Sequence, residues 1–287
     1  MNKNVSIAIT AALVMNGGIV NAQEATNIGK HNITLSKDVM TPETLWAMGR
    51  IGSAQASPDG NKIVYQVGYY SVKENRGHQV ICVMDSDGQN VRQLTTSAKS
   101  EGSPVWLDNH TIAFLLDGQI WSMNSDGTNR KKLSSSDIEI EGFRFSPDGK
   151  KVLLIKSIPY YGTIKKNPSD LPKASGRLIT DMNYRHWDHY VETIAHPFVA
   201  EVTANGISKN DVDIIEGEPY ESPLAPFGGI EQFDWSKDSK QIAYTCRKKE
   251  GVKYAVSTDA DIYLYNIDTK KTVNLCKPAD YVEPEIN

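Results

Sequence analysis

One short module of turn and strand recurs along the chain, and it constrains the fold more than any other feature. Each copy begins with a tight turn of the type Ser-Pro-Asp-Gly and continues into β-branched and apolar residues. Proline presets φ at the second turn position, aspartate bonds the local backbone and glycine tolerates the exit geometry. The copies lie at 57–65, 146–154 and 236–244, with a shortened version at 106–114.

A second hairpin follows these modules, and its turn is Asp-Gly or a close relative, which favours a tight hairpin. The second hairpins lie at 81–95, 120–134 and 261–275. Two hairpins per repeat, at a period of about 40 to 50 residues, are typical of a four-stranded blade of a β-propeller. We therefore predict an all-β fold, an incomplete propeller ring. Its expected blades are 49–96, 102–135, 142–216 and 229–277, and Tyr281 to Asn287 would open a fifth.

The first of these hairpin turns contains Asp85-x-Asp87-Gly88, which also invites comparison with a calcium-binding loop. The EF-hand pattern requires its glycine at the sixth position and a later glutamate. Here the glycine is fourth, so the pattern favours a plain hairpin turn.

The N-terminus has the features of a secretory signal peptide at residues 1–22. Lys3 supplies a positive charge, Val5 to Val14 is apolar, and Val20-Asn21-Ala22 approximates a cleavage site before Gln23. The alternative is a hydrophobic N-terminal strand. Cleavage would place the protein in a bacterial periplasm or outside the cell, with no membrane segment left.

Residues 23–48 form an N-terminal segment before the first blade. Within it, Thr41 is suited to cap a helix, Pro42 to occupy its first position and Gly49 to stop it. We expect one short helix here, packed against the propeller.

The three cysteines are not expected to form a disulfide. Cys82 lies in an apolar run and reads as a buried strand thiol. Cys246 and Cys276 would lie on the second and fourth strands of one sheet, about 9.6 Å apart. A disulfide needs Cα atoms within about 7 Å.

Charges of both signs are mixed along the chain, with 31 Lys and Arg against 35 Asp and Glu and a net charge of -4. This balance argues against a protein that binds nucleic acid or a membrane surface. The sequence contains no ligand set that predicts a metal or another cofactor.

The third expected blade carries an insertion at 160–192, and insertions inside a repeat usually form loops on one face. It contains the cluster Arg185-His186-Trp187-Asp188-His189, with Glu192 close behind. These side chains either face a ligand or pack on the blade, and packing is the simpler interpretation. A metal site from His186, Asp188 and His189 lacks a further well-spaced ligand. Two tyrosine pairs at strand ends, Tyr69-Tyr70 and Tyr160-Tyr161, either line a channel or serve as packing residues, and packing is again favoured.

Taken in order, these features resemble the propeller of the prolyl oligopeptidase family. The shared features are Thr-Pro-Glu-Thr-Leu-Trp at 41–46, the Ser-Pro-Asp-Gly turns, Arg-His-Trp-Asp at 185–188 and His-Pro-Phe-Val at 196–199. The similarity covers residues 38–287 and is greatest to the secreted bacterial dipeptidyl-peptidase and acylaminoacyl-peptidase branch.

The resemblance implies a propeller joined to an α/β-hydrolase domain whose catalytic serine stands in a G-x-S-x-G turn. Here Gly206-Ile207-Ser208 begins such a turn, but Lys209-Asn210 breaks it. No catalytic residue is therefore carried over, and the chain alone is expected to be inactive. Family propellers have about seven or eight blades. The chain would thus be an N-terminal part of a longer peptidase or a truncated gene product.

In that family the propeller gates access and contacts the free N-terminus of the substrate. Asp188 or Glu192 would pair with the substrate ammonium group, Trp187 would stack on the peptide, and Arg185 belongs to the same cluster. The expected partners are a peptide substrate, held through the hydrolase domain, and a second copy in the full-length protein.

Two other functions remain open. One is a non-enzymatic periplasmic interaction propeller like TolB, although the N-terminal segment is too short for the domain that precedes that propeller. The other is a metal-dependent propeller hydrolase, for which the sequence shows no ligands. The hypothesis of a peptidase propeller also accounts for the long insertion.

Overall fold

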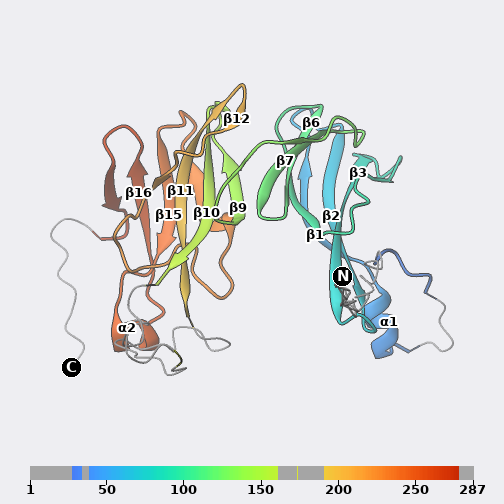
Figure 1. Cartoon of the computed structure of the whole chain (residues 1–287), viewed down its shortest axis with the longest axis horizontal. Coiled ribbons are helices and arrows are strands. Elements are labelled where there is room, and N and C mark those ends of the chain that lie inside the picture. Colours follow the sequence, from blue (N-terminus) through green and yellow to red (C-terminus); the bar gives the residue numbers. More distant parts are fainter. Residues whose placement is uncertain (1–27, 34–38, 161–172, 174–190, 278–287) are drawn as a thin grey trace, which may run out of the picture.

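Antiparallel sheets make up most of the computed structural model, which describes residues 28–33, 39–160, 173 and 191–277 (Figure 1). Sheet one is formed by β1 (Arg50–Ala56), β2 (Lys62–Ser71), β3 (Arg76–Asp85) and β4 (Arg92–Gln93). Sheet two is formed by β5 (Glu101–Trp106), β6 (Thr111–Leu116), β7 (Gln119–Asn124) and β8 (Lys131–Lys132). Sheet three is formed by β9 (Ile140–Phe145), β10 (Lys151–Pro159), β11 (Thr193–Thr203), β12 (Gly206–Ile207) and β13 (Val212–Asp213). Sheet four is formed by β14 (Phe233–Trp235), β15 (Gln241–Cys246), β16 (Asp261–Asn266) and β17 (Lys271–Asn274), and the 3-10 turn η1 (Ile230–Gln232) precedes it.

In sheets one, two and four the strands lie side by side in chain order. Each of these sheets is a pair of linked hairpins, as the repeated turn modules predict. The all-β fold built from four-stranded propeller blades is therefore confirmed.

Sheet three departs from this plan because its outer edge is divided between two short strands. Both β12 and β13 pair with β11, so the sheet has five strands where the repeat predicts four. An ion pair and a hydrogen bond fasten β13 and the residue before it to the sheet: Lys156 Nζ lies 2.6 Å from Asp211 Oδ2, and His196 Nδ1 lies 2.8 Å from Asp213 Oδ2. Buried polar groups require such partners, and the His196 side chain has no exposed surface.

Apolar clusters lie between successive sheets, and single strands contribute to two of them. In β10, Leu153 faces the cluster shared with sheet four, whereas Val152 and Leu154 face the cluster shared with sheet two. Ile112 and Phe114 of β6 pack with Val64 of β2 between sheets one and two. Sheets buried on both faces explain why these strands are apolar at nearly every position.

The two Ser-Pro-Asp-Gly turns and their relative Ser-Lys-Asp-Ser at 236–239 close in the same way in three sheets. Each serine hydroxyl donates to the aspartate two residues later, at 2.6 Å for Ser57 and Asp59, 2.7 Å for Ser146 and Asp148, and 2.6 Å for Ser236 and Asp238. The serine hydroxyl bond, together with backbone N–H donors, lowers the pKa of all three aspartates. The sequence motif is thus a self-contained hydrogen-bonded unit that starts the second strand of each sheet.

A tryptophan at the end of the first strand of a sheet, here called the inner strand, links sheets in pairs. The indole of Trp106 at the end of β5 donates to the carbonyl of Gln55 in sheet one at 3.1 Å. The indole of Trp235 at the end of β14 donates to the carbonyl of Arg144 in sheet three, also at 3.1 Å. We call each of these bonds a tryptophan latch.

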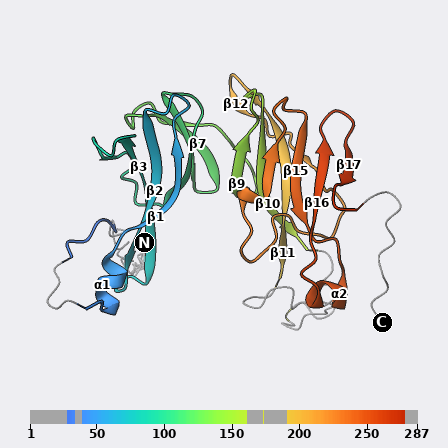
Figure 2. The same cartoon turned by 180° about the vertical axis from the view of Figure 1, so that it is seen from behind.

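Two short helices lie at the same end of the sheets (Figures 1 and 2). Helix α1 (Pro42–Ala47) is the predicted helix, with Thr41 accepting from the Thr44 amide and Pro42 at the first position. It packs on sheet one through Trp46, whose ring meets Tyr70 edge-on at 5.5 Å. Helix α2 (Gly251–Val256), between β15 and β16, is not indicated by the repeat.

Several single-residue expectations fall on described positions. Tyr69 packs beside Val67, Val80 and the buried Cys82, while Tyr160 is buried at the foot of the insertion. Cys82, Cys246 and Cys276 are free thiols. The signal peptide, Tyr161 and the expected fifth strand lie outside the described residues.

The aspartates of the three turns should make stability depend on acid. Their pKa values are lower in the folded chain, so their contribution is complete above about pH 4 and is lost as pH falls through the folded pKa. Replacing Asp59, Asp148 and Asp238 together by asparagine should therefore flatten the fall in the urea midpoint between about pH 5 and pH 3. Asn substitutions at Asp137 and Asp268, outside these turns, control for the lost charge. A urea midpoint that falls as steeply in the turn variant as in the unsubstituted chain would contradict the prediction.

Candidate functional site

The insertion of sheet three leaves and returns at one point of the molecule. Pro159 at the end of β10 pairs with Thr193 at the start of β11, and the Tyr160 amide donates to the Glu192 carbonyl at 2.9 Å. Of the four residues expected to contact substrate, Glu192 is described, with an exposed side chain. Arg185, Trp187 and Asp188 lie outside the described residues. Glu192 therefore marks where the insertion joins the sheet.

The loop between β13 and η1 connects this region to sheet four. The Ser222 amide donates to the Ala195 carbonyl of β11 at 2.9 Å. Its hydroxyl donates to the Thr245 carbonyl of β15 at 2.8 Å. One residue thus ties the loop to both sheets, next to the end of β15 that leads to α2.

A buried carboxylate stands in this loop. Glu221 is 2% exposed and accepts a hydrogen bond from the Tyr254 hydroxyl of α2. The Arg247 guanidinium lies 4.4 Å from the centre of the Tyr254 ring and donates to the Ser257 carbonyl at 2.9 Å. The loop acid, the helix and the end of β15 therefore form one hydrogen-bonded unit.

A second carboxylate of the loop, Glu218, pairs with Lys248, whose Nζ lies 2.6 Å from Oε2. The same ammonium group lies 4.6 Å from the Tyr263 ring centre and 6.0 Å from that of Tyr220. Cation–π attraction adds to the ion pair. Burial, and then the hydrogen bond to Glu250, raise the pKa of Tyr220 to about 12. Burial also raises the pKa of Tyr263.

This end of sheets three and four is acidic and aromatic, a chemistry that suits cationic groups. We call Glu218, Tyr220, Glu221, Lys248, Tyr254 and Tyr263 the acidic-aromatic cluster. Sequence reasoning centred on the insertion and missed it. The available signal was the group Glu216, Glu218 and Glu221 around Tyr220, directly after a blade.

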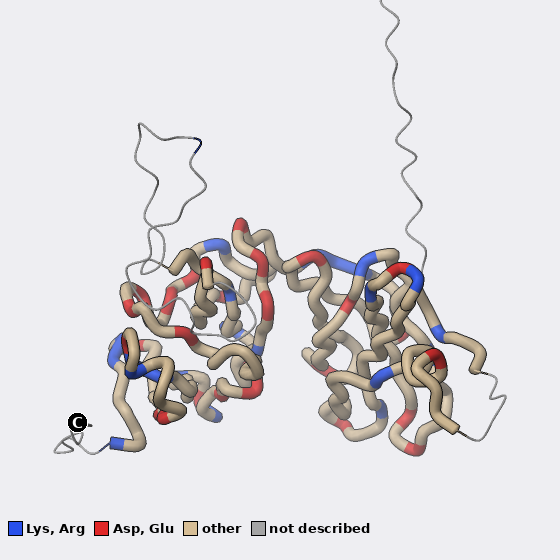
Figure 3. Tube along the Cα trace, turned by 90° about the horizontal axis from the view of Figure 1, so that it is seen from below, with Lys and Arg blue, Asp and Glu red and all other residues tan. Residues whose placement is uncertain are grey.

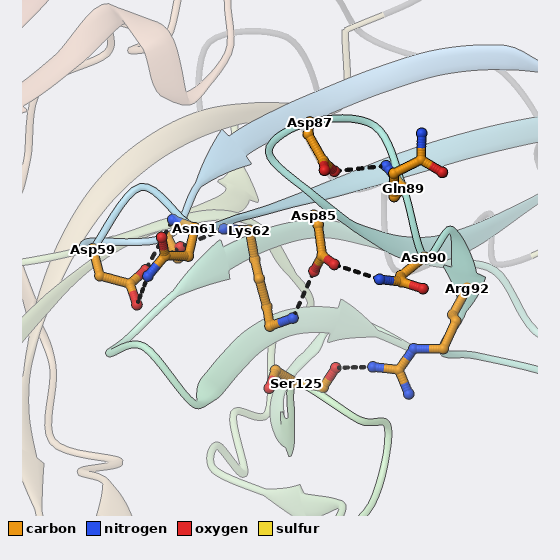
Figure 4. A network of polar contacts seen from close by, with 10 residues as sticks. Asp59, Asn61, Lys62, Asp85, Asp87, Gln89, Asn90, Arg92 and Ser125 are labelled. Atoms are coloured by element: carbon orange, nitrogen blue, oxygen red, sulfur yellow. Dashed lines mark hydrogen bonds and ion pairs between the residues drawn. The ribbon is translucent and has the colours of Figure 1, made fainter.

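The carboxylates of the hairpin at Asp85 are held in hydrogen bonds of the turn and of the neighbouring strand. One oxygen of the Asp85 carboxylate accepts from Lys62 Nζ at 2.9 Å, and the other accepts from Asn90 at 2.6 Å (Figure 4). Asp87 accepts from the Gln89 amide at 2.9 Å. Hydrogen bonds to Asn90 and Lys62 lower the pKa of Asp85. Both acids thus bond residues of the turn or of β2, as in a plain hairpin turn.

Within the described part of the chain, no group of three or more His, Cys, Asp or Glu is arranged to hold a metal ion. Nor does any described helix have the length and apolar character needed to cross a membrane. Charges of both signs are interspersed over the described chain trace (Figure 3).

Known proteins similar in sequence are peptidases. The chain is 41% identical over 280 residues to dipeptidyl-peptidase 5 of Porphyromonas gingivalis, a match that covers 96% of this chain and 40% of that protein. It is 37% identical over 247 residues to dipeptidyl-peptidase 5 of Porphyromonas endodontalis, covering 84% of this chain and 36% of that protein. The chain thus spans about two fifths of the length of these relatives. No protein-family model matches the chain.

Solved structures share the fold at low sequence identity. An acylaminoacyl peptidase in complex with Z-Gly-Gly-Phe-chloromethyl ketone aligns with a TM-score of 0.53 at 12% identity, over 81% of this chain and 33% of that one. The Pyrococcus horikoshii acylaminoacyl peptidase aligns with a TM-score of 0.52 at 13% identity, again over 81% of this chain and 33% of that one. With the dipeptidyl-peptidase 5 relatives, these likenesses confirm the resemblance carried by the sequence motifs. The chain is similar in sequence to part of dipeptidyl-peptidase 5 and shares its fold with part of the acylaminoacyl peptidases, as the resemblance to the prolyl oligopeptidase family implies.

Proposed function

We propose that this chain is the gating and substrate-selecting propeller portion of a periplasmic serine exopeptidase. The observation that carries the proposal is the 41% identity to a dipeptidyl-peptidase across nearly the whole chain. The nucleophile would be supplied by an α/β-hydrolase domain beyond these residues, because no G-x-S-x-G turn occurs in the sequence.

Selection of a free peptide N-terminus requires a carboxylate that faces solvent and a wall that excludes other groups. Glu192 supports this role because it is exposed and stands where the insertion rejoins the sheet. The acidic-aromatic cluster lies at the same end of the two sheets and would supply aromatic walls there. Arg185, Trp187 and Asp188 of the insertion complete the proposed contact surface. A TolB-like interaction role remains the alternative, and it predicts no preference for a free peptide amine.

Without a nucleophile, the purified chain should not turn over dipeptidyl substrates. The measurement is release of a chromophore from dipeptidyl p-nitroanilides, with a dipeptidyl-peptidase as the positive control. Turnover that survives repurification and replacement of Ser208 by alanine would overturn the view that catalysis lies elsewhere.

Peptide binding should depend on the free amine and on Glu192. A dipeptide amide with a free N-terminus is expected to bind, and its N-acetylated form to bind more weakly, when titrated by NMR. Glu192→Gln should weaken binding of the free-amine peptide about 2- to 5-fold, the range of an exposed ion pair. Glu139→Gln, at an exposed position outside this region, is the matched control. Equal binding of both peptides would instead favour the interaction-module alternative.

Export should remove residues 1–22, the expected signal peptide. We expect the protein expressed in a bacterial host to appear in the periplasmic fraction with Gln23 as its first residue, which intact-mass spectrometry detects. Val20→Arg and Ala22→Arg together should block cleavage, because the signal peptidase requires small residues there. A cytoplasmic protein that retains residues 1–22 would contradict both the signal peptide and the periplasmic location.

A further inference from the structure

The interface between sheets two and three, here called the seam, lacks the latch that its neighbours have. Trp106 and Trp235 are the last residues of the inner strands β5 and β14, and each donates to the preceding sheet. The equivalent residue of β9 is Phe145. A phenyl ring has no N–H, so the carbonyl of Val105, which stands where Gln55 and Arg144 stand, receives no indole bond.

Hydrogen bonds donated by turn amides follow the same division, because they cross the two latched interfaces. The amide of Asp59 in sheet one donates to Asn109 of sheet two at 3.0 Å. The amide of Asp148 in sheet three donates to Ser239 of sheet four at 3.1 Å. Asn109 and Ser239 each lie three residues before the residue that pairs with the latch tryptophan. In sheet three, Phe145 pairs with Val152, and the residue three positions before Val152 is Gly149. Glycine offers no side-chain acceptor across the seam.

Polar side chains are otherwise frequent at the latched interfaces. Arg144 of sheet three pairs with Asp234 of sheet four at 2.7 Å, and Ser103 of sheet two donates its amide to Gln66 of sheet one at 2.8 Å. Arg92 of sheet one points at the Ser125 carbonyl of sheet two (Figure 4). Between the described residues of 101–134 and 140–216, by contrast, no side-chain hydrogen bond or ion pair crosses the seam.

Two backbone hydrogen bonds and an apolar cluster hold the seam. The Ile207 amide donates to Leu133 O at 2.8 Å, and the Ile140 amide donates to Gly118 O at 2.9 Å. The cluster includes Ile120, Phe143 and Phe198. Apolar attraction is non-directional and tolerates small rotations, whereas latches and side-chain bonds fix orientation.

The shape of the chain agrees with this division. Sheets one and two form one body and sheets three and four another, and the two meet along one side in every view (Figures 1, 2 and 3). A pocket of about 440 Å³ opens at the seam, lined in part by Leu133, Phe145, Val202 and Ile207.

We propose that the seam is a built-in joint, at which the two latched pairs of sheets rotate against each other as rigid units. The motion is a shear of packed apolar surfaces. The rotation changes the spacing between the inner strands β5 and β9. Val105 of β5 and Phe143 of β9, together with Gln55 of β1, line a further pocket of about 360 Å³. The joint thus adjusts the width of the inner rim without breaking any sheet.

Distances between spin labels test the joint in the full chain carrying Cys276→Ser. One pair of labels, at Lys132 and Lys209, spans the seam. Pairs at Val91 and Lys132, and at Lys209 and Asp268, span the two latched interfaces and serve as controls. The cross-seam distance distribution should be broader than both controls, and equal widths would overturn the proposal.

Adding a tryptophan at position 145 tests whether the missing latch is what makes the seam mobile. Phe145→Trp should narrow the cross-seam distribution and slow hydrogen exchange at the Ile140 and Ile207 amides about 2- to 12-fold, the effect of one added hydrogen bond. Unchanged exchange in a folded variant would overturn the latch explanation.

The reverse substitution keeps the test decisive if the added ring prevents folding. Trp235→Phe should make the interface of sheets three and four behave like the seam, broadening the Lys209 and Asp268 distribution. Exchange at the Asp148 amide should accelerate by about 2- to 12-fold. If exchange and width both stay at the unsubstituted values, the latches do not set the stiffness of the interfaces.

Discussion

Face-to-face packing of one sheet on the next is the interaction on which the rest of the molecule depends. A central sheet here buries both of its faces, so each of its middle strands serves two cores at once. In β10, Val152 and Leu154 pack toward sheet two while Leu153 packs toward sheet four. A change in the register of β10 by one residue would exchange these sets, and neither core would fit. The Ser-Pro-Asp-Gly turn that opens β10 sets that register, which links a four-residue motif to the packing of three sheets.

Polar side chains decide how stiffly the packed sheets are joined. Apolar clusters bring all neighbouring sheets together, but the tryptophan latches and turn bonds occur between sheets one and two and between sheets three and four. The same repeat therefore gives interfaces of two kinds, depending on one aromatic residue and one turn position. The acidic-aromatic cluster lies wholly on the body of sheets three and four, where Ser222 and Trp235 hold its loop and strands together. Its geometry is thus independent of any movement at the seam.

Local signals predicted the parts of the structure whose causes are local. The helix at Pro42 has its cap, its proline and its stop within nine residues of sequence, from Thr41 to Gly49. The blade turns close through bonds between residues two to five apart. The split outer edge of sheet three was not predicted, because β13 is held by Lys156 and His196, which lie far from Asp211 and Asp213 in the chain. Helix α2 has no side-chain cap, and Tyr254 within it is buried against other elements. The acidic-aromatic cluster was missed for the same reason, since its loop, strand end and helix come from three separate segments.

The sequence by itself determined the all-β class, the repeat of hairpin pairs, the helix before the first sheet and the resemblance to dipeptidyl-peptidases. These follow from turn chemistry and apolar runs, which act between neighbouring residues. Only the tertiary structure decided which carboxylates gather at the end of sheets three and four, and which sheets are latched to which. Those outcomes depend on contacts such as Glu221 with Tyr254 and Trp235 with Arg144, where the partners are 33 and 91 residues apart and meet only when whole sheets have packed.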